Sequence, residues 1–441
     1  MARNSGKSGN QSPVKPKGNS STLRQRKVNK GNTVTNKDLV GEDHSSVGKK
    51  RWETVRKRTV FTLLMIGGFF MVLAGGPVPI MIMVFGLQLA IYKELIGLAS
   101  EKNKERDLPW QRALNWYFLL TTEYYLYGHI FNRYMAKVPI LGRYAPLMTS
   151  HHKFISFTVY LIGFVWFVAT LQKGFYRFQF GHFAWTHMAL LLVIFQTHFM
   201  VENIFAGIFW FFIPIALVIV NDIFAYIFGF FFGRHSLISL SPKKTWEGYI
   251  GGGLATLAFG FLLTSLLSRW NYVICPIEHL RTNALHHSQC TPNPIFAHQD
   301  YELPYWLSMR REILKLSIRP VQIHSLALSA FASLIAPFGG FFASGVKRAF
   351  NIKDFGNSIP GHGGVSDRFD CQIFMATFSH IYYTTFIEAS PITIAKVLET
   401  IVNGLTIEDQ VVLFLKLKDH LMTQEVLEEG VAKAIETLVG S

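Results

Sequence analysis

The sequence predicts an all-α protein that crosses a membrane several times, and three observations support this prediction. Of the 441 residues, 50% are hydrophobic and only 16% are charged, whereas soluble domains usually carry about a quarter charged residues. Phenylalanine alone accounts for 39 residues. Apolar runs recur along the chain and approach the ~20 residues that a helix needs to span a bilayer. We therefore expect a polytopic helical membrane protein embedded in a lipid bilayer.

These runs predict about nine transmembrane helices within a domain that covers residues 59–390. They lie near residues 59–76, 78–99, 113–131, 154–171, 183–201, 204–220, 249–267, 321–343 and 371–388. Basic residues just before the first run place the N-terminal side in the cytosol by the positive-inside rule. The alternation of spans then places Arg234–Lys244 and Lys347–Lys353 on the cytosolic face. The turn at Gly75-Gly76-Pro77 and a long loop over about 269–320 are predicted on the far face.

The two ends of the chain differ from this apolar middle. Residues 1–58 contain 15 Lys/Arg and 4 Asp/Glu with few, scattered apolar residues, so we expect a disordered basic cytosolic tail. Beside a membrane span, its expected partner is anionic lipid and not nucleic acid. Residues 391–441 predict an amphipathic helical segment for docking or oligomer contact, such as a homodimer. Nine spans would place it on the far side, and a tenth or re-entrant piece within 221–233 would reverse that.

Three other residues leave alternatives open. Cys275 and Cys290 flank a polar loop, so they form a disulfide if that loop faces an oxidising lumen and are otherwise two free thiols. Glu123 lies inside an apolar run, where an ionisable side chain is costly. It either has a function there or is hydrogen-bonded to a Tyr or Thr of a neighbouring helix.

One polar segment, Ser344–Asp370, concentrates the residue types of a phosphate site. Its glycines allow close approach of a ligand and can offer N–H groups to phosphate oxygens. Asp367 and Asp370 are spaced to share a helix face, which suits a hard cation such as Mg²⁺. Basic side chains around carboxylates are typical of a metal–phosphate site. Beside the two aspartates, the candidates are Ser344, Lys347, Arg348, Lys353, Asp354, His362, Gly363, Gly364 and Arg368.

A second polar group interrupts an apolar run of almost thirty residues. Asp222 lies within that run, where a carboxylate is costly without a partner or a metal. The following Ser-Pro-Lys243-Lys244-Thr245 can present two ammonium groups and a hydroxyl to a polyphosphate. Taken alone, the two lysines would indicate only positive-inside topology.

With these residues in place, the chain resembles phosphatidate cytidylyltransferases, also called CDP-diacylglycerol synthases. Ser344–Asp370 matches their signature S-x-x-K-R-x₄-K-D-x₅-P-G-H-G-G-x₂-D-R-x-D without a gap. The basic tail and the far-side loop are similar to the eukaryotic, particularly the fungal, branch. One departure is Gly339-Gly340, where bacterial relatives often have an acidic residue.

The resemblance implies transfer of the cytidylyl group of CTP to phosphatidate, with Mg²⁺, at a cytosolic face of the endoplasmic reticulum membrane. Asp367 and Asp370 would hold the metal, with Asp354 and Asp222 as weaker candidates. The lysines and arginines would meet the phosphates, and His362 would donate to a phosphate oxygen or carry a proton. The departure at Gly339-Gly340 leaves the number of metal ions open.

The sequence leaves two alternative functions open. A CTP-dependent polyprenol or phytol kinase faces similar charge problems, but it transfers the γ-phosphoryl group to an alcohol. A transporter or lipid-binding scaffold would spread its ionisable groups over several spans, whereas here they cluster on one predicted face.

Overall fold

The computed structural model describes residues 44–100, 108, 110–135, 150–277, 279–285, 290–302, 315–360, 363–388 and 394–424. The chain divides into two compact units, residues 1–56 and 57–441. The first 43 residues of the predicted tail lie outside the described part, and its residues 44–58 are helical and not disordered, because they form the start of helix His44–Gly75. The contacts reported below all belong to the second unit.

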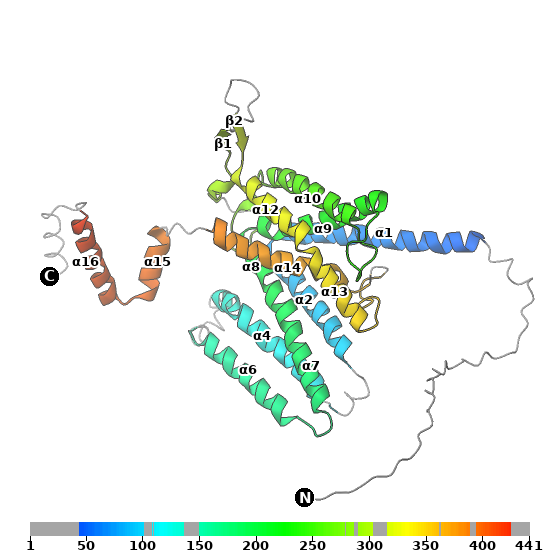
Figure 1. The fold of residues 1–441 in the computed structure, drawn as a ribbon. Coiled ribbons are helices and arrows are strands. Elements are labelled where there is room, and N and C mark those ends of the chain that lie inside the picture. The colour runs from blue at the N-terminus through cyan, green and yellow to red at the C-terminus, as the bar shows by residue number, and fades with distance from the viewer. Residues whose placement is uncertain are drawn as a thin grey trace, which may run out of the picture. The chain divides into compact units, whose positions relative to one another are not determined.

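The described chain is almost entirely helical (Figure 1). Its α-helices are α1 His44–Gly75, α2 Pro77–Ala99, α4 Trp110–Met135, α6 His152–Ala169, α7 Tyr176–Ala189, α8 Gln196–Ala206, α9 Ile208–Phe232, α10 Trp246–Leu267, α11 Asn271–Ile274, α12 Pro320–Leu334, α13 Pro337–Ala349, α14 Ser366–Tyr382, α15 Ile394–Gly404 and α16 Ile407–Thr423. Two π-helical turns, Leu190–Phe195 and Tyr383–Ile387, follow α7 and α14. Among the described residues, one antiparallel strand pair joins β1 Gln299–Glu302 to β2 Lys315–Ile318.

Seven helical stretches of the described chain are long and apolar enough to cross a membrane, which confirms the polytopic helical fold. They are Arg58–Gly75, Pro77–Ala99, His152–Ala169, Tyr176–Ala206, Ile208–Phe232, Trp246–Leu267 and Pro320–Ala349. The other two predicted spans are helical, as α4 and α14, but they are not among the seven. Ionisable residues such as Glu123 and Asp370 lower their hydropathy.

Several helices begin or end at other residues than predicted, because of a proline and a glycine in the chain. The predicted single span 321–343 is two helices, because Pro337 lacks an N–H and cannot donate the next hydrogen bond of the helix. α12 therefore ends at Leu334 and α13 begins at Pro337. Gly207, with φ of 133°, separates α8 from α9. α9 then continues unbroken to Phe232, so residues 221–232 are neither a tenth span nor a re-entrant piece.

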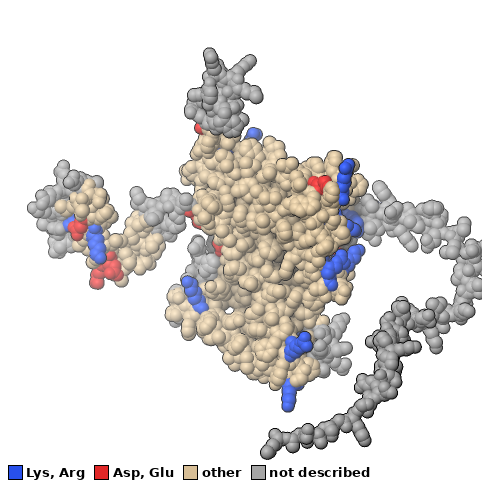
Figure 2. All heavy atoms as spheres, in the orientation of Figure 1, with Lys and Arg blue, Asp and Glu red and all other residues tan. Residues whose placement is uncertain are grey.

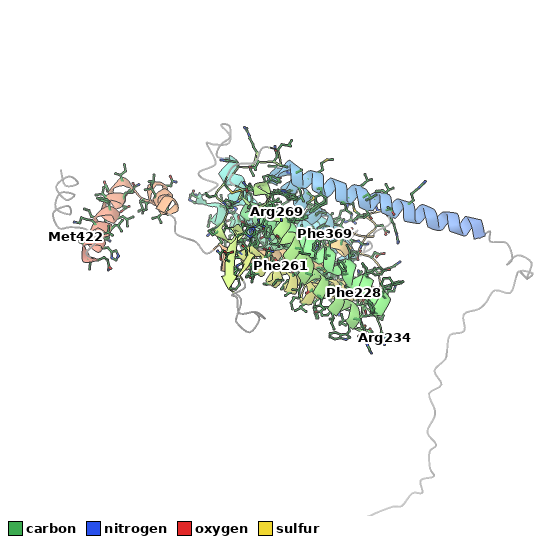
Figure 3. All side chains as sticks on the ribbon, turned by 90° about the horizontal axis from the view of Figure 1, so that it is seen from above. Phe228, Arg234, Phe261, Arg269, Phe369 and Met422 are labelled. Carbon is green, nitrogen blue, oxygen red and sulfur yellow. A yellow bond between two sulfur atoms is a disulfide. The ribbon has the colours of Figure 1, made fainter. Side chains whose placement is uncertain are left out.

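α14 packs in the middle of the bundle, against α2, α8, α9, α12 and α13. Stacked aromatic rings such as Phe331 and Phe378, with centroids 3.9 Å apart, fix its contact with α12. α9 packs closely along α10, since a Cβ at Gly252 would lie 2.9 Å from the backbone nitrogen of Ala225. Figure 3 shows Arg234 beyond Phe228, just past the C-terminal end of α9.

The turn and the long loop that were predicted on the far face lie together, near the C-terminal end of α10. Ala284 in the long loop donates its backbone N–H to the carbonyl oxygen of Ala74, at 3.0 Å, beside the Gly75-Gly76-Pro77 turn. Cys275 and Cys290 form a disulfide in this loop, with Cα atoms 6.0 Å apart, which decides between the two alternatives for these cysteines. Glu123 is buried in α4, and its carboxylate makes no hydrogen bond to the described residues, so the expected Tyr or Thr partner is not found there.

Candidate functional site

The Ser344–Asp370 segment folds into the last turns of α13, a connecting loop and the first turn of α14. Glycine contacts bring the two helices close together. A Cβ at Gly339 would lie only 2.5 Å from the carbonyl oxygen of Asp370. The loop closes on itself where Ile359 donates its N–H to the carbonyl oxygen of Gly363, at 2.9 Å. His362 lies outside the described residues, and its predicted role stays a prediction.

Asp367 is turned toward the protein and is engaged through both carboxylate oxygens. Lys347 donates to Oδ1 at 2.6 Å, and the side chains of Lys347 and Asp367 are only 18% and 8% exposed. Oδ2 accepts the backbone N–H groups of Phe355 at 3.0 Å and Gly364 at 3.2 Å. Asp367 therefore joins α13, the loop and α14, and the Gly364 N–H points to this carboxylate.

Asp370, one turn further along α14, has a different environment. Its Oδ1 accepts the N–H of the adjoining Cys371 at 2.8 Å. Its Oδ2 faces Gly340 of α13, where a Cβ would lie 3.4 Å away. Gly340, which has no side chain, thus leaves space directly beside the Asp370 carboxylate.

The second polar group reaches the same place from α9 and the loop before α10. Lys244 lies 3.9 Å from the Asp222 carboxylate and 5.5 Å above the ring of Phe341 in α13. Asp222 also interacts electrostatically with Arg368 and Asp370. The structure therefore unites the two groups that lie more than a hundred residues apart. Figure 2 shows Lys and Arg side chains along the edge of the molecule where α10 begins and α13 ends.

Several predicted binding residues have local structural contacts. The Ser344 hydroxyl donates to the carbonyl oxygen of Gly340 at 2.8 Å. Thr245 caps α10 by accepting the N–H of Gly248 at 3.2 Å. Others are solvent-exposed around the site, namely Lys243, Arg348, Lys353 and Asp354. A Cβ at Gly363, whose φ is 85°, would lie 3.3 Å from the Asp354 carboxylate.

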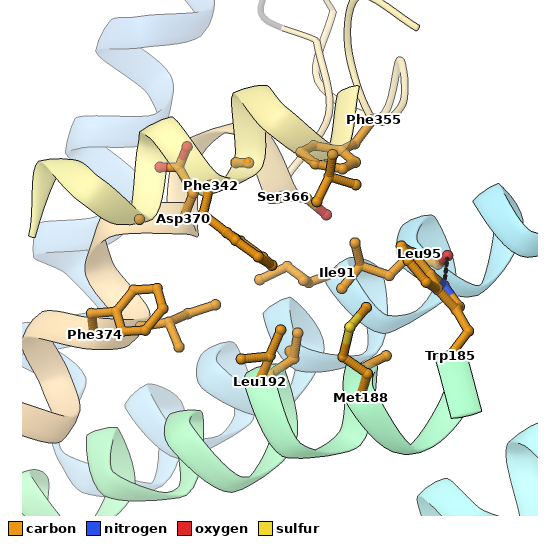
Figure 4. A pocket seen from close by; sticks show the side chains of 16 residues that line it. Ile91, Leu95, Trp185, Met188, Leu192, Phe342, Phe355, Ser366, Asp370 and Phe374 are labelled. Atoms are coloured by element: carbon orange, nitrogen blue, oxygen red, sulfur yellow. Dashed lines mark hydrogen bonds between the residues drawn. The ribbon is translucent and has the colours of Figure 1, made fainter. Parts of the chain in front are cut away.

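An apolar pocket opens beside Asp370 (Figure 4). Helices α2, α7, α13 and α14 supply its walls. Its polar side chains are few, so an apolar group fits it better than a nucleotide. The lining includes Ile91, Leu95, Trp185, Met188, Leu192, Phe342, Phe355, Ser366, Asp370 and Phe374.

Glu94 of α2 also belongs to this region, and the sequence analysis missed it. Its Oε1 accepts hydrogen bonds from the Ser358 hydroxyl at 2.6 Å and the Val365 N–H at 3.0 Å, and Oε2 accepts the Ser366 N–H at 2.9 Å. A carboxylate inside a predicted span was the available signal, but nothing in the sequence links it to a segment more than 260 residues away.

A preformed metal cage is absent from the described residues, since they contain no group of three or more His, Cys, Asp or Glu arranged to hold a metal ion. Asp222, which lies 3.9 Å from the Lys244 ammonium, and Asp370, whose Oδ2 faces Gly340, are less engaged by protein groups than Asp367. Mg²⁺ is commonly held by one or two carboxylates, with substrate phosphates and water completing its octahedron. The pair fits such an ion.

Comparison with known proteins identifies the family of this chain. The model of the cytidylyltransferase family matches residues 56–386. The chain is 46% identical to human phosphatidate cytidylyltransferase 1 over 379 residues, 86% of this chain and 81% of that protein. It is 45% identical to phosphatidate cytidylyltransferase 1 of Arabidopsis thaliana over 404 residues, 90% and 95% of the two chains. The phosphatidate cytidylyltransferase of Saccharomyces cerevisiae is 47% identical over 352 residues, 79% and 76%. The predicted resemblance is confirmed: the chain belongs to the cytidylyltransferase family.

Proposed function

We propose that this protein transfers the cytidylyl group of CTP to phosphatidate, giving CDP-diacylglycerol and pyrophosphate. A phosphate oxygen of phosphatidate attacks the α-phosphorus of CTP and forms a new P–O bond. The bond between the α-phosphorus and its bridging oxygen to the β-phosphate breaks, and pyrophosphate leaves with that electron pair. A phosphate monoester oxygen is already nucleophilic, so the reaction needs no activated Ser or Cys.

The observation that carries the proposal is the meeting of Asp222, Asp370, Lys244 and Arg368 beside an apolar pocket. The reaction brings two polyanions together, so cations at the site lower their repulsion and stabilise the departing pyrophosphate. The apolar pocket suits part of a lipid substrate whose phosphate reaches Asp370. A water-soluble acceptor would not need this lining.

Mg²⁺ is the expected cofactor, with Asp370 and Asp222 as its protein ligands and Asp354 as a weaker candidate. When bound, it supplies charge neutralisation to the phosphates. Asp367, predicted as a ligand, already accepts three protein hydrogen bonds. We therefore assign it chiefly to holding Lys347 and the loop.

The chain's own residues orient the substrates for in-line attack. Lys244 and Arg368, which flank Asp222, meet the phosphates of CTP or phosphatidate. Lys347 is fixed by Asp367 and presents its charge from α13. The exposed Lys243, Arg348 and Lys353 add positive charge around the entrance, and His362 is a candidate proton carrier.

The proposal also includes the membrane in which the protein works and the face on which its site lies. We place the protein in the endoplasmic reticulum membrane, with the site on the cytosolic face, where CTP is available. Phosphatidate would then enter laterally from the bilayer. Homodimer formation through residues 391–441 remains a prediction.

The position of a radiolabel in the product tests this function against a CTP-dependent lipid kinase. The purified protein is given phosphatidate, a polyprenol or phytol as the lipid alcohol, and CTP labelled with ³²P at either the α- or the γ-phosphate. Cytidylyl transfer puts only the α-label into lipid. Entry of the γ-label into a lipid alcohol would instead establish kinase chemistry and refute the proposal.

A further inference from the structure

Glu94 makes a set of contacts that the proposed function does not use. It lies on α2, and its half-buried carboxylate reaches the loop between α13 and α14. Its three hydrogen bonds come from Ser358 in the middle of that loop and from Val365 and Ser366 at the start of α14. One side chain therefore ties two separate points of the signature segment to a different helix.

Two glycines of the segment lie directly against this carboxylate, where a larger residue would not fit. A Cβ at Gly356 would lie 2.7 Å from Glu94 Oε1, and one at Gly364 would lie 2.8 Å from Oε2. Real Cβ atoms do not approach oxygen so closely. The sequence suggested that the signature glycines admit a ligand, but Gly364 and Gly356 admit a protein carboxylate.

The position of Glu94 also matches the electrostatics of α14. The N-terminus of a helix carries partial positive charge and unpaired N–H groups, which a carboxylate stabilises. Asp367 holds the same loop from the other side through Phe355 and Gly364. The first turn of α14, directly before Asp370, is thus fixed between two carboxylates.

We propose that Glu94 is a positioning residue for cytidylyl transfer: it holds the loop and the first turn of α14 so that Asp370 and Lys347 face the reacting phosphates. The inference rests on the proposed function. Glu94 is not assigned to a metal or to substrate, because both of its oxygens accept hydrogen bonds from protein donors. Small displacements of aligned groups are costly to catalysis, and a shift of about 1 Å can lower the rate about 100-fold.

The first test compares Glu94→Gln with Lys93→Gln, a control at the neighbouring exposed position of α2. The glutamine amide nitrogen cannot accept a hydrogen bond, so at least one of the three contacts is lost. We expect Glu94→Gln to lower kcat about 10- to 100-fold and to raise the Mg²⁺ concentration for half-maximal activity. The unfolding temperature should stay near that of the wild type, and amide exchange at Val365 and Ser366 should become faster. Lys93→Gln should match the wild type.

A double-mutant cycle tests the contact itself and does not depend on Glu94→Gln alone. Gly356→Ala should impair the wild type, because each of the three atoms nearest to its new Cβ belongs to Glu94. In a Glu94→Ala background the same change should cause no further loss. Additive losses in the cycle would overturn the inference, as would unchanged kcat and Mg²⁺ dependence in Glu94→Gln. Failure of the wild type to transfer the α-label would instead refute the proposed function itself.

Discussion

Two aspartates three residues apart in the signature have opposite environments. Asp367 is engaged by Lys347 and two backbone N–H groups, and its side chain is 8% exposed. Asp370 accepts the N–H of its neighbour Cys371 and otherwise faces the space beside Gly340 and the Asp222 charge. The residue pattern alone gave both aspartates the same metal-binding role. Their partners separate a residue that holds the site together from one that remains open to a cation.

This difference predicts distinct effects on stability. Asp367→Asn removes the charged partner of a largely buried Lys347, and breaking such a pair costs about 3 kcal/mol or more. Asp370→Asn removes a carboxylate that no basic side chain of the described structure contacts within 4.0 Å, so the unfolding temperature should change little. Thermal unfolding of the two purified variants in the same detergent measures the contrast. Equal destabilisation would contradict the assignment.

Substitution of the two neighbouring lysines, Lys243 and Lys244, should change the KM by different amounts. Lys244 lies beside Asp222 and over the Phe341 ring, whereas Lys243 is exposed to solvent. We expect Lys244→Ala to raise the KM for CTP or phosphatidate by about tenfold, the effect of losing ~1.4 kcal/mol of binding, and Lys243→Ala to raise it less. Steady-state kinetics with each substrate varied checks this order. Unchanged kinetics in Lys244→Ala would remove that lysine from the site.

At the scale of elements, the site depends on the close packing of α13 against α14. The sequence predicted both helices and their polar residues, because apolar runs and charge clusters are local features. It did not predict the break before Pro337 within the span 321–343, since a run of apolar residues outweighed one proline. Nor did it predict that α2 supplies Glu94, because such a contact depends on tertiary packing between distant segments.

Glycine substitutions in α13 test the packing of these two helices. Gly339→Ala would place a Cβ 2.5 Å from the Asp370 carbonyl oxygen and 2.8 Å from the Phe374 ring. The helices must then separate, at a cost of about 1–3 kcal/mol for overpacking, and activity should fall because Asp370 moves. Gly345→Ala is the matched control, since its Cβ would meet only Leu240 at 3.6 Å, an ordinary contact. Unfolding temperature and turnover should distinguish the two, and a fully active Gly339→Ala variant would contradict the packing argument.

At the scale of the molecule, α10 joins the candidate site to the disulfide-bonded loop. It begins at Trp246, beside Thr245, and ends at Leu267, just before the loop with Cys275 and Cys290. Its 22 residues span about 33 Å at 1.5 Å per residue, close to the ~30 Å hydrocarbon core of a bilayer. The site and the disulfide therefore lie at opposite ends of a helix that is long and apolar enough to cross a membrane, and their placement on opposite faces stays a prediction of the charge pattern. Which face is cytosolic remains part of the proposal.

The disulfide should contribute to stability and not to the chemistry. It closes a loop with a sequence separation of 15 residues, for which loss of the cross-link costs about 3 kcal/mol. The Cys275→Ser/Cys290→Ser variant should therefore unfold at a lower temperature and retain the wild-type kcat at a temperature where it is folded. In intact microsomes, both cysteines should resist alkylation until reductant is added. Alkylation without reductant would contradict a loop held in an oxidising lumen.

The central claim is that the open carboxylate of Asp370 serves phosphatidate-dependent cytidylyl transfer. The most direct measurement is the yield of pyrophosphate and CDP-diacylglycerol from CTP, by purified wild type and Asp370→Asn, with and without phosphatidate and Mg²⁺. We predict equal amounts of the two products from the wild type, only when phosphatidate and Mg²⁺ are both present. Asp370→Asn should have the same unfolding temperature as the wild type, but its rate of product formation should be lower by about 100-fold or more. This is the effect of removing one group that stabilises the transition state. Near-normal turnover by the folded variant, or product formation by the wild type without Mg²⁺, would contradict the account.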